Sequence, residues 1–301
     1  MSLYKKYRPS NFDDVIGNES QIESLKKTLS KGNPPQTYLF TGPSGCGKTT
    51  LARICARELG ATDFSIREIN SADNRGIDTA RDIIEGLKYS LPGQRCRVFI
   101  IDELHMTTSV WQNAMLKPLE DTPKDTYFFL CTTDPGKLIK AIKTRCTEVK
   151  VNSLDSEDIY RLIKRISKKE ELDVSKDILE EISENCDGSP RKAIVLLEKI
   201  AGLDNEKKMK EIISMGEETE AEVIELCRAL LNGNWKEISG IIRELKETDQ
   251  EKIRYAVLGY MNAVLLKSGK GQAGMVIENF SEPFYNMGKA GVTLAAFQSC
   301  Q

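Results

Sequence analysis

The stretch TGPSGCGKTT, residues 41–50, constrains the fold more than any other feature of the sequence. It follows the short apolar run YLF (38–40) and precedes TTLARICARELG (49–60), which has the composition of a helix. This setting predicts a phosphate-binding loop, because glycines let backbone N–H groups turn toward phosphate and a helix N-terminus favours negative charge. The pattern G-x-x-x-x-G-K-[ST] is met at Gly42, Gly47, Lys48 and Thr49. In such a loop the lysine balances the β and γ charge, and the threonine hydroxyl is offered to Mg²⁺.

Short apolar strands alternate with helices through the first half of the chain. Strands are expected at 38–41, 65–70, 97–102 and 126–132, and helices at 22–29, 49–60, 77–89 and 109–120. This alternation predicts an α/β fold with a parallel sheet covered on both faces. Ligands of such sheets bind beyond the carboxyl ends of the strands, where the loop at 41–48 lies. We expect the strand at 97–102 to neighbour the strand that leads into this loop.

The second half has a helical pattern throughout. Helices are expected in 153–172 and at 174–186, 190–202, 219–232, 235–247, 250–267 and 271–280, with a polar break at AGLDNEKKMKE (201–211). The sequence therefore predicts an α/β domain over 1–151 and two small all-helical domains over 152–210 and 211–301.

Composition excludes several classes of protein. The 301 residues are 40% apolar and 29% charged, which is typical of a soluble globular chain. No window reaches 18 uncharged apolar residues, and the N-terminus is too polar for a secretory signal, so we expect a cytoplasmic protein without a membrane partner. Eight scattered cysteines without a CxxC pair argue against zinc and against disulfides. Residues 1–150 carry 22 basic and 18 acidic side chains, a mild excess that a solvated surface also explains.

The run VFIIDELH (98–105) supplies two acidic residues at the end of a strand. Asp102 is expected to bind Mg²⁺ together with Thr49, and Glu103 to act as general base toward a water in line with the γ-phosphate. The alternative is an N-cap pair that opens the next helix. His105 is the only histidine, which excludes a site built from several histidines. We expect it in a loop beside the site.

Two further groups have both functional and ordinary interpretations. Thr132 and Thr133 end a strand, where a hydroxyl orients an attacking water or simply caps the strand. Arg145, in AIKTRCTEV (141–149), either stabilises transferring phosphate from a neighbouring subunit or forms a surface salt bridge. The residues alone favour the salt bridge.

Six motifs in order resemble the sliding-clamp-loader branch of the AAA+ ATPases, which includes gamma/tau subunits of bacterial DNA polymerase III, replication factor C small subunits and phage counterparts. They are YKKYRPSNFDDVIGNE, GPSGCGKT, FIIDELHM, CTTDPGKL, TRC and GSPRKA, and they span nearly the whole chain. The resemblance implies a P-loop NTPase core, a helical lid and an oligomerising collar. Thr144 stands where the family usually has serine, and the bacterial zinc module is missing. These departures leave the source organism open. A phage-encoded protein that acts in the host cytoplasm is one of the sources considered.

The resemblance also implies site residues. It assigns ATP binding, with Mg²⁺ on Thr49 and Asp102, to Tyr7, Arg8, Pro9, Val15, Ile16, Gly17, Gly42, Pro43, Ser44, Gly45, Cys46, Gly47, Lys48, Thr49, Thr50, Asp102 and Arg191. Catalysis is assigned to Glu103 and Lys48 with Thr133 as sensor 1, Arg191 as sensor 2, and Arg145 as a finger that reaches the ATP of the adjacent subunit.

Contacts with DNA and the clamp are implied for one segment. Arg75 matches the family's switch position, and Arg81 and Lys88 follow close to one helical face, where they are expected to track phosphates. The alternative interpretation is that these basic side chains are ordinary solvated surface charges. In LKYSLPG (87–93), Leu87, Tyr89 and Leu91 are candidates for the apolar contact with the clamp, although core packing explains Leu87 equally well.

The leading hypothesis is therefore an ATP-driven motor subunit of a homo- or hetero-pentamer that opens a sliding clamp and places it on primer-template DNA. A branch-migration or helicase-type AAA+ motor is the alternative, and it predicts a winged-helix domain near the C-terminus. A non-enzymatic ATP-binding scaffold is the third hypothesis. The retained Lys48, Asp102 and Glu103 argue against it.

Overall fold

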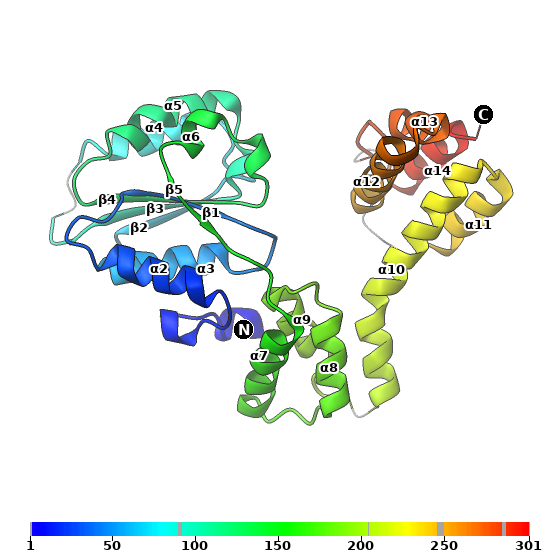
Figure 1. Ribbon diagram of the computed structural model, residues 1–301, viewed down its shortest axis with the longest axis horizontal. Helices are drawn as coiled ribbons and strands as arrows, with labels where there is room; N and C mark the ends of the chain where they lie inside the picture. The colour runs from blue at the N-terminus through cyan, green and yellow to red at the C-terminus, as the bar shows by residue number, and fades with distance from the viewer. Residues whose placement is uncertain (1, 90–91, 204, 246–249, 285–286, 301) are drawn as a thin grey trace. The chain divides into compact units, whose positions relative to one another are not determined.

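The structure is a computed structural model that describes residues 2–89, 92–203, 205–245, 250–284 and 287–300. These residues form two compact units, 1–206 and 207–301, of which the first contains the sheet (Figure 1). Within the described residues, no helix combines the length and the apolar character needed to cross a bilayer.

A five-stranded parallel sheet lies at the centre of the first unit. Its strands are β1 (Thr37–Thr41), β2 (Ile66–Asn70), β3 (Arg97–Asp102), β4 (Thr126–Thr132) and β5 (Thr147–Lys150), in the order β2-β3-β4-β1-β5. The parallel α/β prediction is confirmed. One expectation was wrong: β3 does not neighbour β1, because β4 lies between them and pairs with both.

Helices cover both faces of this sheet, as Figure 1 shows. On one face lie α2 (Glu19–Leu29) and α3 (Lys48–Glu58), and on the other α4 (Ile77–Gly86), α5 (Ser109–Glu120) and α6 (Lys140–Lys143). Because side chains alternate along a strand, each strand feeds two cores.

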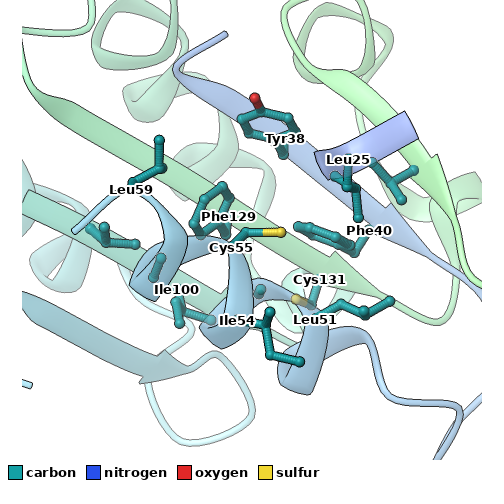
Figure 2. Packing of buried hydrophobic residues seen from close by; sticks show 14 of the residues in the cluster. Leu25, Tyr38, Phe40, Leu51, Ile54, Cys55, Leu59, Ile100, Phe129 and Cys131 are labelled. Atoms are coloured by element: carbon teal, nitrogen blue, oxygen red, sulfur yellow. The ribbon is translucent and has the colours of Figure 1, made fainter. Parts of the chain in front are cut away.

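The core beneath α3 is shown in Figure 2. Tyr38 and Phe40 of β1 and Phe129 and Cys131 of β4 point into it. Leu39 of β1 belongs to the opposite core, with α4 and α5. Burial on both faces fixes the register of β1, and with it the position at which the chain leaves the sheet after Thr41.

Three helices complete the first unit: α7 (Ser156–Lys169), α8 (Lys176–Glu184) and α9 (Pro190–Ile200). Asp155 caps α7 by accepting the backbone N–H of Asp158 at 2.7 Å. The N-terminal segment, with the short helices α1 (Leu3–Lys6) and η1 (Phe12–Asp14), is tied to these helices. The Leu3 N–H donates to Glu198 at 3.1 Å, and the Tyr7 hydroxyl donates to Glu170.

The second unit is built from helices in its described part. They are α10 (Glu206–Asn232), α11 (Trp235–Glu244), α12 (Gln250–Ser268), α13 (Gly271–Asn279) and α14 (Lys289–Gln298). The polar break expected at 201–211 was wrong in its second half, because α10 begins at Glu206. Helix propensity of the lysine- and glutamate-rich residues there outweighs the absence of apolar periodicity.

A buried ion pair lies inside the second unit. Arg254 Nε donates to Glu251 Oε2 at 2.8 Å, and both residues are buried. Arg254 Nη1 also donates to the carbonyl oxygens of Phe280 and Ser281, which links α12 to the end of α13.

All eight cysteines are unpaired, and six of them are buried. Burial raises the pKa of Cys146 and of Cys227 to about 12, so neither thiol is a ready thiolate.

Gly17 offers a test of the packing between the N-terminal segment and α7. Its φ is +70°, and an added Cβ would lie 2.4 Å from Leu154 Cδ2. We expect Gly17→Ala to cost about 1–2 kcal/mol for the left-handed backbone and about 1–3 kcal/mol more for the overpacking. Gly93→Ala is the matched control, since its φ is +76° with no atom within 4 Å of the added Cβ.

The measurement is urea unfolding followed by the fluorescence of the buried Trp111, in a Trp235→Phe background that removes the other tryptophan. Equal losses of stability in the two alanine variants would contradict the close approach of Gly17 to Leu154.

Candidate active site

The loop between β1 and α3 needs glycine at defined positions. Gly42 has a φ of +145°, and a Cβ there would lie 2.0 Å from the carbonyl oxygen of Val151. Gly45 has a φ of +76°, and a Cβ there would lie 2.2 Å from Ser189 Oγ at the start of α9. Gly47, with a φ of +100°, is the N-cap of α3. The loop thus presents the unpaired N–H groups of a helix N-terminus, a site that favours phosphate.

Lys48 is buried inside this loop. Its ammonium donates to the carbonyl oxygens of Gly42 at 2.9 Å and Pro43 at 2.8 Å. Burial lowers the pKa of Lys48, and the negative charge of Glu103 opposes that shift. The ammonium group of Lys48 is thus held by the loop, and Lys48 and Glu103 border the same cavity.

Thr49 and Asp102 meet at the mouth of the loop. Thr49 Oγ1 donates to Asp102 Oδ2 at 2.8 Å, although Thr49 lies in the first turn of α3 and Asp102 ends β3. A hydroxyl and a carboxylate oxygen are ligands that suit Mg²⁺, which usually takes one or two carboxylates and completes its shell with phosphate and water. The described residues contain no group of three or more His, Cys, Asp or Glu placed for a metal ion. The pair therefore fits a cation shared with phosphate.

Glu103 follows Asp102 in an uncommon backbone conformation, with a φ of 51°. Its N–H donates to Asp102 Oδ1 at 3.1 Å, and its carbonyl oxygen accepts from Met106 N at 2.8 Å. Left-handed backbone at a residue other than glycine is costly and persists where neighbouring bonds enforce it. The turn thus places Glu103 at the cavity that Lys48 also lines.

A cavity of about 140 Å³ joins these groups to the N-terminal segment and to α7 and α9. Apolar side chains such as Val15, Leu154 and Ile194 form one wall, and the phosphate loop forms another. Most expected ATP-binding residues line it: Tyr7, Arg8, Pro9, Val15, Ile16, Ser44, Gly45, Cys46, Gly47, Lys48, Thr49, Thr50, Asp102 and Arg191, together with Glu103. Gly17, Gly42 and Pro43 do not line it.

Several lining residues escaped the sequence analysis. They are Tyr4, Asp14, Asn18, Leu51, Leu154, Leu162, Pro190 and Ile194. Leu162 falls in the helix expected within 153–172, but no local pattern shows that a residue of that helix borders a cavity. Only the packing of α7 and α9 against the loop reveals this role.

Two arginines bring positive charge to the cavity from outside the loop. Arg191, the second residue of α9, has its guanidinium carbon 5.8 Å from the centre of the Tyr4 ring. Burial lowers the pKa of Arg8, and the charges of Arg53 and Arg191 lower it further. These positive groups lie close enough to repel one another, so an anion in the cavity would relieve the repulsion.

The end of β4 places Thr132 and Thr133 differently. Thr132 is fully buried, and its Oγ1 lies 3.3 Å from His105 Nδ1 and accepts the N–H of Asp134 at 3.1 Å. His105, in η2 (Leu104–Met106), also lies 3.4 Å from Glu103 Oε2. The expectation of a position beside the site holds for His105. Thr133 is half-buried and does not line the cavity.

Arg145 does not line the cavity of its own chain. It precedes β5, whose Thr147 pairs with Tyr38, so it lies at the amino end of the strands, opposite the phosphate loop. Its Nε and Nη2 donate to Glu120 Oε2 at 3.0 and 2.5 Å, and Nη1 donates to the carbonyl oxygen of Ala141 at 3.0 Å. The salt bridge considered from the sequence is therefore present.

The basic residues around α4 do not share a helical face, which corrects the expectation from their spacing. Arg75 precedes the helix and donates to the carbonyl oxygen of Ala72 at 3.1 Å, and Lys88 follows the end of the helix at Gly86. Arg81 alone lies within α4, where it pairs with Asp78 at 3.0 Å.

The candidate clamp contacts differ in exposure. Tyr89 is 65% exposed, whereas Leu87 is half-buried against the core beneath α4. Leu91 lies outside the described residues.

Comparisons with known proteins agree with this architecture. Residues 38–153 match the ATPase family associated with various cellular activities (AAA), and residues 161–201 match the RCF1/5-like AAA+ ATPase lid domain. The chain is 30% identical to DNA polymerase III subunit tau of Bacillus subtilis, over 91% of this chain and 54% of that protein. It is 34% identical to DNA polymerase III subunit gamma of Buchnera aphidicola subsp. Schizaphis graminum, over 65% of this chain and 60% of that protein.

Solved structures add the fold. RuvB of Thermotoga maritima superposes with a TM-score of 0.60 at 19% identity, covering 87% of this chain and 88% of that chain. The chain spans about half the length of the tau subunit that it matches. The family matches cover nearly all of the sheet and most of α7–α9, and these parts line the cavity together with the N-terminal segment. Residues 38–153 thus form a domain of the AAA ATPase family, and it is followed by an RCF1/5-like AAA+ lid domain at residues 161–201.

Proposed function

We propose that this chain is an ATP-driven motor subunit of a sliding-clamp loader, which opens the clamp and places it on primer-template DNA. The observation that carries the proposal is the convergence of Lys48, Thr49, Asp102, Glu103 and Arg191 on one cavity. The similarity to DNA polymerase III tau and gamma subunits supports a role of this ATPase site in DNA replication. The domain limits proposed are 1–151 for the ATPase core, 152–210 for the lid and 211–301 for an oligomerising collar.

The residues divide the reaction between them. Glu103 accepts the proton of a water that attacks the γ-phosphate of ATP, and Lys48 and Arg191 bind the phosphate oxygens. Mg²⁺, held by Thr49 and Asp102, would neutralise charge that develops on those oxygens. Thr133 serves as sensor 1. The apolar wall around Val15 and Ile194 accommodates the base, with Tyr7, Arg8 and Pro9 beside it.

Arg145 completes the site of an adjacent subunit. Its position at the opposite end of the strands from its own phosphate loop supports a role in trans. A guanidinium has five donors, and three are bonded to Glu120 and Ala141, which leaves two for a phosphate. This requirement implies assembly with further subunits, and we propose a pentamer of identical or distinct subunits.

The alternative of a branch-migration or helicase-type motor has less support. The RuvB superposition reports the fold alone. A winged-helix domain needs strands, and the described residues of 207–301 contain helices without a strand.

Glu103→Gln tests the general base. Because the amide keeps the size of the side chain but accepts no proton, we expect hydrolysis to fall by roughly 10²- to 10⁴-fold while ATP still binds. Lys48→Ala, in contrast, should weaken binding itself. Phosphate release and titration with a fluorescent ATP analogue measure the two effects. Glu157→Gln, an exposed change in the first turn of α7, is the control; wild-type turnover by the Glu103 variant would refute the assignment.

Arg145→Ala tests the trans contact. In the assembled complex with clamp and primed DNA, we expect hydrolysis to fall by roughly 10³-fold or more, because an arginine finger contributes at least that much. ATP affinity of the free chain should not change. Lys143→Ala, on the neighbouring α6, is the control.

A mixture of the Lys48→Ala and Arg145→Ala chains should regain activity, because each supplies what the other lacks. If Arg145→Ala alone kept full activity in the complex, the trans role would be excluded.

Arg75→Ala tests the DNA contact. We expect the stimulation of hydrolysis by primed DNA to be lost, with the unstimulated rate unchanged, because Arg75 lies outside the cavity. Arg81→Ala should have the smaller effect, since Asp78 already pairs with that guanidinium. DNA affinity measured against salt concentration should show a shallower slope for Arg75→Ala. An unchanged slope together with full stimulation would remove Arg75 from the interface.

A further inference from the structure

His105 occupies a position that the proposed chemistry does not use. It is the only histidine of the chain, and its side chain is 12% exposed. Nδ1 lies 3.4 Å from Glu103 Oε2 and 3.3 Å from Thr132 Oγ1. The imidazole does not line the cavity, whereas Glu103 does. The ring therefore contacts Glu103 without bordering the cavity itself.

The backbone hydrogen bonds of this turn fix the main chain of Glu103 but do not fix its side chain. The N–H and carbonyl groups of Glu103 are bonded to Asp102 Oδ1 and Met106 N, and its φ of 51° is uncommon for glutamate. A side chain that is 36% exposed has several staggered rotamers available, and a general base must hold the one that brings it within hydrogen-bond distance of its water. A neighbouring donor is needed to select one.

The contacts of Nδ1 specify the kind of donor. An ionised carboxylate only accepts hydrogen bonds, so a lone pair on Nδ1 would repel Glu103 Oε2. A hydrogen on Nδ1 can instead be shared between Glu103 Oε2 and Thr132 Oγ1. Thr132 is fixed, because it is fully buried and its Oγ1 accepts the N–H of Asp134. Hydrogen bonds of this length in a free site commonly shorten when the substrate is bound.

We propose that His105 is a positioning residue: its Nδ1–H, shared with Thr132 at the end of β4, holds the Glu103 carboxylate in the orientation that accepts a proton from water. The inference rests on the proposed function and adds to it the group that orients the base, in the same way that nucleophile–base pairs are oriented by a third residue. His105 does not contact the nucleotide. Its loss therefore slows hydrolysis and leaves ATP binding as it is.

The experiment compares two amide replacements. In His105→Asn the amide nitrogen takes the place of Nδ1, whereas in His105→Gln it takes the place of Nε2. We expect His105→Gln and His105→Ala to lower kcat by roughly 10- to 100-fold, as expected for a displaced catalytic group. His105→Asn should recover most of this loss. Dissociation constants for a fluorescent ATP analogue should stay within about twofold of wild type. Thr132→Val should lower kcat in the same way, with Thr132→Ser as its matched control.

A second readout uses the single histidine directly. Nitrogen NMR of histidine-labelled protein yields one imidazole, and we expect its neutral form to carry the hydrogen on Nδ1. Hydrogen on Nε2 would overturn the proposal, and so would equal kcat values for the asparagine and glutamine variants. A parallel loss of ATP affinity in every variant would also overturn it, since that result indicates a merely structural role.

Glu103→Gln separates this inference from the function beneath it. If that variant abolishes hydrolysis while His105→Ala keeps the wild-type kcat, the positioning role fails and the proposed function stands. Wild-type hydrolysis by Glu103→Gln would instead remove the base that His105 is proposed to orient.

Discussion

The hydrogen bond between Thr49 and Asp102 is the interaction on which the rest of the site depends. It joins the start of α3 to the end of β3 at 2.8 Å, although β4 lies between β1 and β3 in the sheet. Parallel strands make this contact possible, because their carboxyl ends meet at one edge and the loop after β1 can fold over that edge. Glu103 directly follows Asp102, so the same strand, β3, also positions Glu103. A shift of register in β3 would move Asp102 and Glu103 together away from Thr49.

The sequence predicted the parts of this structure that depend on local patterns. Apolar runs located the strands, and the glycine spacing located the phosphate loop, because these signals depend on near neighbours alone. The order of the strands has no local signal in the sequence, because it depends on how each crossover helix packs. The expectation that β3 neighbours β1 was therefore wrong. Residues such as Tyr4 and Ile194 were missed for the same reason, because only tertiary packing brings the N-terminal segment and α9 to the cavity. The Glu120 carboxylate beside Arg145 likewise carries no sequence signal.

The basic residues assigned to the site lie at two ends of the sheet. Lys48, Arg8 and Arg191 are associated with the cavity at the carboxyl end, where they repel one another or are buried. Arg145 is held by Glu120 at the amino end. In the proposed function, this chain holds most of the groups needed to bind a triphosphate, and its Arg145 acts on the nucleotide of an adjacent subunit. We infer that binding and hydrolysis are separable, and that assembly controls only the second.

The specific rate of ATP hydrolysis, measured against the extent of assembly by sedimentation over a range of protein concentrations, tests this division. Wild-type chain, supplied with any co-subunit, should bind ATP equally well at every concentration. Its hydrolysis per chain should rise with the fraction assembled. A chain that sediments as a monomer and hydrolyses ATP at the full rate of the complex would contradict the division.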